Sequence, residues 1–317
     1  MTCRCPLLVL TLLVGGLLVG CDTTATQPES QVAVEAYLRA EAPLDTVRLT
    51  RTVGAGDTFD PQATGVQGAD VEVRQLDDNG NIVATIPYSE GSTPGVYAPT
   101  SAPMDTVQPA TPYQLHVETG DGTTITSTTT VPDTIQVVDA TKPTTEYQCD
   151  SLKPALTITS PPRPPSGRQN VYVFTVTSLL DFQSTPATTL ANELTPFYRD
   201  QYEPGDDSLS SFRISSSGLL NEGNFSEGPD GITVDLPWLG IAFYGANEVA
   251  INVVDDNFYD FLRSQSAQQG AFAPGEIPNV IEHVEGGTGV FGSYARAARN
   301  FDIQRDEEFT GSPCDGP

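Results

Sequence analysis

The chain has 317 residues, enough for two domains of ordinary size, and its 41 acidic side chains against 15 Lys and Arg give a formal net charge of −26 at pH 7. So negative a surface repels nucleic acid and anionic lipid headgroups, which makes both poor candidates as partners. The carboxylates are dispersed along the chain, as on a salt-adapted surface, and a dedicated cation-binding role is the alternative.

The N-terminal residues predict a lipoprotein signal peptide over residues 1–20. Arg4 is their only charged residue, and the apolar run that follows ends in the lipobox Leu18-Val19-Gly20-Cys21. The run is shorter than the roughly 20 residues of a membrane-spanning helix and has the length of a signal-peptide core. We therefore expect cleavage before Cys21, acylation of that cysteine and a flexible tether over residues 21–30. An ordinary secretory signal is the alternative.

Residues 31–133 predict an N-terminal antiparallel β-sandwich of immunoglobulin-like or prealbumin-like type. Apolar and polar residues alternate in short runs that Gly, Pro and Asp turns separate, and no segment keeps a helical period. The clearest run is Tyr113–Glu118, in which Tyr113, Leu115 and Val117 are expected to face inward. The strands are expected at residues 32–38, 47–51, 69–74, 82–86, 113–118 and 124–131.

Residues 134–300 predict a second β-rich domain with one short helix. Asp255-Asp256-Asn257 is expected to cap that helix, which runs through Phe258, Phe261 and Leu262. The glycine-rich segment Gly286–Gly292 predicts a tight turn with positive φ. The strands are expected at residues 135–138, 171–177, 232–235, 248–254 and 293–297, with a proline-rich surface loop at 160–167, a long loop or insertion at 180–211 and an acidic tail at 301–317.

Two cysteines remain beyond Cys21 once the signal peptide is removed, namely Cys149 and Cys314. In an exported protein such a pair is expected to form a disulfide, and two free thiols are the alternative. The bond would close a loop of about 165 residues and stabilise the fold by roughly 4–5 kcal/mol in the chain-entropy model.

A series of short motifs follows the lipobox in a characteristic order. They are Val34–Leu38, Gly68–Val73, Gly95–Tyr97, Tyr113–Val117 running to Val131-Pro132, and Pro278–Glu282 followed by Gly286–Gly292. In this order and spacing the chain resembles a family of bacterial lipoproteins known as domain of unknown function 4249. The resemblance covers nearly the whole mature chain. It implies an outer-membrane lipoprotein, often encoded beside a TonB-dependent receptor, and it implies no catalytic residues.

Few residues are candidates for catalysis or metal binding. His116 is expected on the solvated face of its strand. His283, within Ile281–Glu285, could hold a divalent cation with the neighbouring carboxylates, but one imidazole is a weak ligand set, so we predict no metal site and no cofactor. Trp238 is expected in the core, with a sugar-stacking platform as the alternative. Neither a Gly-x-Ser-x-Gly nor a His-Glu-x-x-His motif occurs in the sequence.

The sequence therefore predicts a non-enzymatic accessory protein. We expect it to be anchored by lipid to the outer membrane and to work with a TonB-dependent receptor in nutrient transport. The alternative is a surface hydrolase that acts on polysaccharide through Asp/Glu pairs. A purely structural envelope protein is a third possibility.

Replacing Cys21 by Ser tests the anchor. Without the thiol no acyl chain can be attached, so the Cys21→Ser variant should lose labelled palmitate and move from the membrane pellet to the soluble fraction. The control is Cys3→Ser, within the expected signal peptide, which should stay labelled and pelleted. Full membrane retention of unlabelled Cys21→Ser would contradict the predicted anchor.

Overall fold

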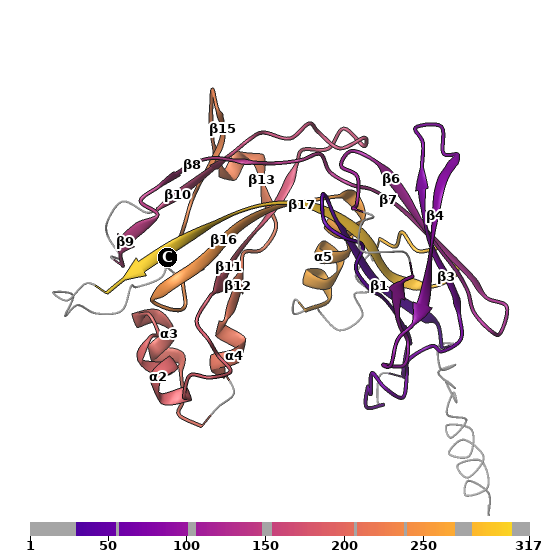
Figure 1. The fold of residues 1–317 in the computed structure, drawn as a ribbon, viewed down its shortest axis with the longest axis horizontal. Coiled ribbons are helices and arrows are strands. Elements are labelled where there is room, and N and C mark those ends of the chain that lie inside the picture. The colour runs from indigo at the N-terminus through magenta and orange to yellow at the C-terminus, as the bar shows by residue number, and fades with distance from the viewer. Residues whose placement is uncertain are drawn as a thin grey trace, which may run out of the picture.

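The computed structural model describes residues 30–54, 57–100, 106–147, 154–205, 208–237, 240–269 and 281–305. Two lobes form an arch, and one long strand runs from one lobe into the other (Figure 1). Both lobes are built mainly from strands, which confirms the predicted β-rich fold class. None of the helices in these ranges is long and apolar enough to cross a membrane.

The N-terminal lobe is the predicted all-β unit. Its alternating pattern buries Tyr113, Leu115 and Val117 as expected, and Phe291 from the far end of the chain completes the same core. Its strands are β1 (Val32–Arg39), β2 (Val47–Arg51), β3 (Asp70–Leu76), β4 (Ile82–Glu90), β5 (Val96–Pro99), β6 (Pro112–Glu118) and β7 (Thr124–Thr130).

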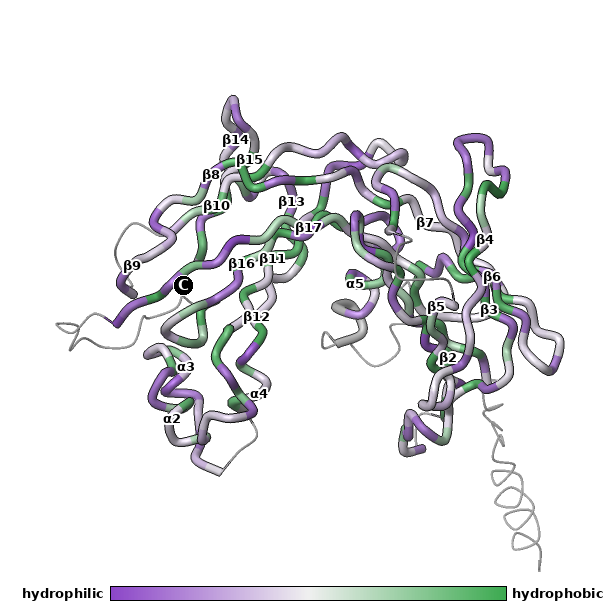
Figure 2. Tube along the Cα trace, in the orientation of Figure 1, coloured by the Kyte–Doolittle hydropathy of each residue, from purple (hydrophilic) through white to green (hydrophobic). Residues whose placement is uncertain are grey.

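The C-terminal lobe packs a small sheet against one face of a larger one. Leu156, Ile158 and Val234 of the small sheet share a core with Ile251 and Ala297 of the larger sheet. Figure 2 shows hydrophobic segments where the strands of each lobe meet and hydrophilic ones in the hairpin loops. The strands are β8 (Val137–Thr141), β9 (Thr144–Glu146), β10 (Ala155–Ile158), β11 (Val171–Ser178), β12 (Ile214–Ser216), β13 (Leu220–Asn221), β14 (Ser226–Gly228), β15 (Gly231–Asp235), β16 (Gly245–Val254) and β17 (Thr288–Gln304).

One 13-stranded sheet joins the two lobes. Its order is β12-β11-β16-β17-β1-β2-β5-β4-β3-β6-β7, with β13 beside β11 and β9 beside β17, and the small sheet has the order β14-β15-β10-β8. The N-terminal half of β17 pairs in parallel with β1, and its C-terminal half pairs antiparallel with β16. At the changeover, Tyr294 lies opposite Arg39 on one side and Val254 on the other.

β17 is longer at both ends than the strand expected at residues 293–297. The glycine-rich segment forms a turn only at its start: Gly286 has φ +76°, whereas Gly289, at φ +102°, already lies inside the strand. A Cβ on Gly289 would lie 2.1 Å from the Val34 carbonyl oxygen, so this glycine allows β1 to approach. At the other end, residues 301–304 belong to β17 and not to the expected tail.

The expected helix is present as α5 (Asp256–Gln269), whereas the loop predicted at residues 180–211 is wrong in part. That stretch contains α2 (Ala187–Asn192), α3 (Pro196–Gln201) and α4 (Ser208–Phe212), and a 3-10 turn, η2, follows at Glu222–Asn224. Helices of five or six residues are too short to show a helical period in the sequence. They are held instead by a third small core that includes Leu190, Leu194 and Phe243.

Gly292 determines how closely α5 approaches the sheet. A Cβ at this position would lie 2.9 Å from the Cβ of Phe258 and 3.3 Å from its Cα, so the helix backbone would have to move. We expect Gly292→Ala to lower the free energy of unfolding by about 1–3 kcal/mol, the usual cost of overpacking. The measurement is urea unfolding followed by circular dichroism.

The matched control is Gly223→Ala, because a Cβ at Gly223 meets nothing within 4 Å. This variant should stay within about 0.5 kcal/mol of the wild type. Equal stabilities for the two variants would contradict the close contact between α5 and β17.

Candidate functional site

A cleft of about 820 Å³ opens on the inner face of the arch, between α5 and the strands β1, β17, β16 and β11. We call it the inner cleft. Its lining residues are Tyr37, Arg39, Ala42, Pro43, Leu44, Asp45, Val173, Thr175, Ser216, Ser217, Gly218, Leu219, Asn252, Val254, Phe258, Leu262, Tyr294 and Arg296.

Strand register brings the floor of the inner cleft together. Residues paired across neighbouring strands point to the same face of a sheet. One row across the floor joins Arg39 to Tyr294 and Tyr294 to Val254. The next row joins Arg296 to Asn252 and Asn252 to Val173, and Thr175 is opposite Ser216 beyond it.

An aromatic cluster forms the wall on the side of α5. The Phe258 ring lies 4.9 Å from the Tyr37 ring and 6.3 Å from the Tyr294 ring, measured between centroids. Burial, with a smaller contribution from the negative charge of Glu35, raises the pKa of Tyr37 to about 12. The Tyr37 phenol therefore keeps its proton at any physiological pH and remains a hydrogen-bond donor.

The charge in the inner cleft differs from that of the chain as a whole. Its charged lining residues are Arg39, Arg296 and Asp45, a majority of cations in a strongly acidic protein. The Arg296 guanidinium forms an ion pair with Glu248. The guanidinium of Arg39, in contrast, has no ion-pair or hydrogen-bond partner within the described residues. Arg39 is thus an exposed cation without a direct counterion among the described residues.

Asn252 supplies a buried acceptor in the floor. The residue is 7% exposed, and its Nδ2 donates to the Val173 carbonyl oxygen at 2.9 Å. This bond fixes the orientation of the amide, because the opposite flip would set two oxygens against each other. The Oδ1 atom is then buried without a hydrogen-bond partner among the described residues. Leaving such an acceptor unpaired costs about 1–3 kcal/mol.

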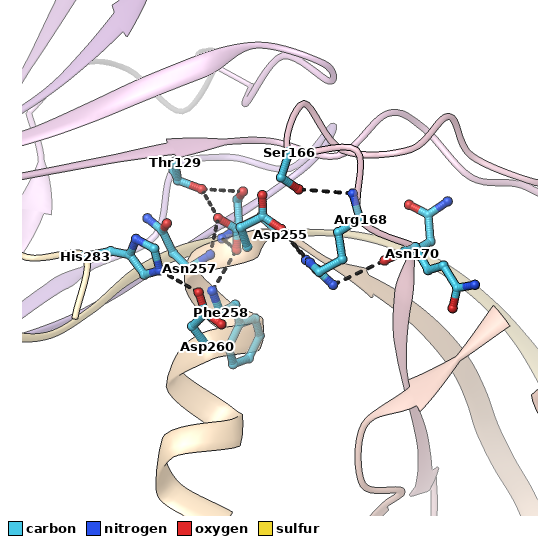
Figure 3. A network of polar contacts seen from close by, with 12 residues as sticks. Thr129, Ser166, Arg168, Asn170, Asp255, Asn257, Phe258, Asp260 and His283 are labelled. Atoms are coloured by element: carbon cyan, nitrogen blue, oxygen red, sulfur yellow. Dashed lines mark hydrogen bonds and ion pairs between the residues drawn. The ribbon is translucent and has the colours of Figure 1, made fainter. Parts of the chain in front are cut away.

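A buried polar joint lies on the other side of β17 from Tyr294, where α5 begins (Figure 3). Asp255 is 4% exposed, and its Oδ1 accepts hydrogen bonds from the backbone N–H groups of Ser293 and Phe258 at 3.0 and 2.9 Å. Its Oδ2 accepts one from the Thr129 hydroxyl at 2.5 Å. This carboxyl therefore caps α5, as predicted, and also connects β17 to β7.

Asn257 and Arg168 hold the start of the same helix. The Asn257 amide donates to the carbonyl oxygens of Thr128 and Phe291 at 2.8 and 2.9 Å. The Arg168 Nε donates to Asp256 at 2.7 Å, and its guanidinium lies 4.3 Å from the centre of the Tyr259 ring. The beginning of α5 is thus fixed to both lobes.

The two histidines lie away from the inner cleft. The His283 Nε2 is 2.8 Å from Asp260 of α5, and Glu282 instead accepts a hydrogen bond from Thr288. Within the described ranges, no group of three or more His, Cys, Asp or Glu side chains is arranged to hold a metal ion. His116 lies 3.3 Å from Glu118. Its side chain is 19% exposed and alternates with the buried Leu115 and Val117, so it lies on the outer face of β6, flanked by β3 and β7.

Several residues singled out from the sequence cannot be compared with the structure. Cys21, Cys149, Cys314 and Trp238 lie outside the described residues. The cleft residues, in turn, were not predicted as a site. The one available signal was Asn252, a polar residue within the apolar run Val249–Val254.

The comparisons with known proteins give a family but no activity. The profile of the family described as "Domain of unknown function (DUF4249)" matches residues 21–300. Among curated proteins, none matches this sequence.

Similarity to solved structures is low. Salmonella alpha-2-macroglobulin reacted with methylamine is 11% identical over 87% of this chain and 15% of its own, with a TM-score of 0.23. Escherichia coli alpha-2-macroglobulin activated by porcine elastase is 9% identical over 87% of this chain and 20% of its own, with a TM-score of 0.20. The tetra-tandem repeat in the extending region of a large adhesion protein is 10% identical over 86% of this chain and 49% of its own, with a TM-score of 0.19. The chain thus spans a fifth or less of these macroglobulin chains, and such TM-scores support no argument about function.

The polar joint should make folding stability depend on pH. Burial raises the pKa of Asp255 to about 6, although the hydrogen bonds that it accepts lower it in part. The folded protein thus holds this proton more tightly than the unfolded chain. The resulting stabilisation is complete below about pH 4 and is lost as the pH rises through 6, a loss of about 3 kcal/mol.

Asp255→Asn removes the titrating group and should remove this dependence. The measurement is urea unfolding of wild type and variant at about pH 4 and about pH 8. Between these two pH values only the wild type should lose the part of its free energy of unfolding that is assigned to Asp255. The control is Asp256→Asn, one residue further on, which should keep the wild-type pH dependence. If the free energies of unfolding of wild type and Asp255→Asn differ by the same amount at both pH values, the assignment is refuted.

Proposed function

The chain belongs to the DUF4249 family, and from that premise we propose that it is a non-enzymatic binding protein of the cell envelope, held at the outer membrane by a lipid on Cys21 and working with a TonB-dependent receptor in nutrient uptake. The inner cleft is the part of the molecule that binds the transported compound. The observation that carries this proposal is the cleft itself, with its exposed cation Arg39 and its unpaired Asn252 Oδ1.

The composition of the cleft supports binding. Its volume of about 820 Å³ falls within the usual range of small-molecule sites, roughly 300–1,000 Å³. Aromatic rings form one wall, and a few polar groups converge on the floor, which is the common arrangement of a binding pocket. These groups come from paired strands and a packed helix, so the site is formed before any ligand arrives.

The same composition argues against the hydrolase alternative. Glycoside hydrolysis by the usual mechanisms needs two carboxyl groups about 5–9 Å apart. Among the described residues that line the inner cleft, Asp45 is the only carboxylate, and neither His116 nor His283 lines it. The cleft therefore offers groups that hold a ligand but lacks an acid–base pair.

The anchor supports a role beside a membrane receptor. The expected tether of residues 21–30 spans at most about 35 Å when fully extended. It leads directly into β1, which contributes Tyr37 and Arg39 to the cleft. A lipid on Cys21 would thus keep the cleft close to the membrane surface, where a receptor could take over its ligand.

Capture of the receptor tests the proposal. We expect the tagged wild-type lipoprotein to co-purify a TonB-dependent receptor from detergent-solubilised membranes of its own host. The full-length Cys21→Ser variant, added to the same extract, should capture it as well, because the contact is between proteins and not through a shared micelle. Deletion of the gene should reduce uptake through that receptor.

Failure to capture a receptor, together with normal uptake in the deletion strain, would overturn the proposed function. That result would favour the purely structural role. Turnover of a glycan by the wild-type protein, lost on changing Asp45 to Asn, would instead favour the hydrolase.

A further inference from the structure

The exposed cation of the inner cleft, Arg39, is available to an anionic ligand. Arg39 lies at the cleft beside Tyr294, and its guanidinium can hold a carboxylate through two parallel hydrogen bonds. The second arginine is already neutralised by Glu248, and Asp45 adds a negative charge. Arg39 can therefore pair with one anionic group, whereas a ligand with several phosphates would find too few cations.

The floor of the cleft requires a ligand rich in hydroxyl groups. Asn252 Oδ1 is a buried acceptor that needs an O–H or N–H donor. Around it the lining carries the hydroxyl groups of Tyr37, Thr175, Ser216, Ser217 and Tyr294. The hydroxyls of Ser216 and Ser217 already donate to backbone carbonyl oxygens, so toward a ligand they can only accept. Those of Tyr37, Thr175 and Tyr294 can donate as well, which matches a ligand whose own groups both donate and accept.

The aromatic wall requires a ligand with an apolar face as well. The rings of Tyr37, Phe258 and Tyr294 lie within 4.9–6.3 Å of their neighbours and form a continuous apolar surface at the base of α5. A pyranose ring has a C–H face that can pack on such rings and a rim of hydroxyls that can reach the floor. Tyrosine suits this contact because one end is apolar and the other polar.

The backbone around the cleft argues against an extended peptide. Peptides in grooves commonly pair with an open strand edge, which satisfies their backbone N–H and C=O groups. Here β1, β17, β16 and β11 each pair with a strand on both sides. The edge strand β12 also borders the cleft through Ser216, but it has only three residues, so most of the floor offers side chains to a ligand, which suits a sugar better than a peptide backbone.

The geometry points to a short acidic oligosaccharide, with a uronic acid carboxylate on Arg39, a ring against Tyr37 and Tyr294, and a hydroxyl donating to Asn252 Oδ1. This assignment rests on the binding function proposed above and specifies its ligand class. It gives separate roles to Arg39, which recognises the charge, and to Asn252, which recognises the polyol.

A pair of probes separates these two roles. The purified full-length lipoprotein in detergent is titrated calorimetrically with an aldobiouronic acid, a disaccharide that carries one uronic acid carboxylate, and with its methyl ester, which keeps the rings and removes the charge. Salt is set near 0.15 M, where repulsion by the acidic surface is screened beyond about 8 Å. We expect the acid to bind at least about tenfold more tightly than the ester, a difference of about 1.4 kcal/mol.

Variants locate the binding. Arg39→Gln should weaken binding of the acid by about tenfold and leave the ester unchanged, since only the charge contact is lost. Arg48→Gln is the matched control, because Arg48 is an exposed arginine on the neighbouring strand β2 and does not line the cleft. It should change neither affinity. Asn252→Leu should weaken both probes alike, with a thermal melt to establish that it folds.

The outcomes distinguish this assignment from the proposed function. Equal binding of acid and ester, both lost in Asn252→Leu, would overturn the acidic ligand class and leave the binding function intact. Binding of a tetra-alanine peptide in the cleft, in place of either sugar, would also overturn the assignment. If none of the three probes binds, the assignment fails, and the capture and uptake experiments decide the proposed function independently.

Discussion

Among the described strands, β17 is the one that contributes to the main hydrophobic core of each lobe, and the rest of the molecule is arranged around it. On one of its faces, Phe291 enters the core of the N-terminal lobe and Ala295 enters the core of the C-terminal lobe. Ser293 lies between them, fully buried, where it meets Asp255 and Thr129. The polar joint thus occupies the short distance over which one core ends and the next begins, and buried polar groups there are satisfied by one another.

The other face of β17 builds the site. Because side chains alternate along a strand, the residues between those of the two cores, namely Gly292, Tyr294 and Arg296, must point to the inner face of the arch. Gly292 admits α5, while Tyr294 and Arg296 line the cleft. A single strand therefore fixes the positions of the two lobes and of the cleft residues together. A change that moves β17 in one core must also move the cleft.

The sequence predicts the parts of this fold that rest on local patterns. The strand Tyr113–Glu118 and the capped helix after Asp255 follow from a two-residue period and from capping chemistry, which neighbouring residues determine. At the start of β17, in contrast, the local glycine-rich pattern predicts a turn. Gly289 must be glycine because β1 approaches it, and β1 lies more than 200 residues earlier in the sequence, so the neighbouring residues do not reveal this requirement. The cleft is non-local in the same sense. Arg39 and Tyr294 meet only through a parallel pairing that no short segment encodes.

Two electrostatic effects of different range act on this site. The many carboxylates of the surface form a diffuse negative field, which salt screens beyond about 8 Å at 0.15 M. A contact between the Arg39 guanidinium and a ligand carboxylate takes place at hydrogen-bond distance, well inside that length. As salt rises, the repulsion that keeps an anionic ligand away weakens sooner than the contact that holds it. An acidic surface suited to salt is therefore compatible with an anion contact at Arg39, even though this residue is exposed to solvent.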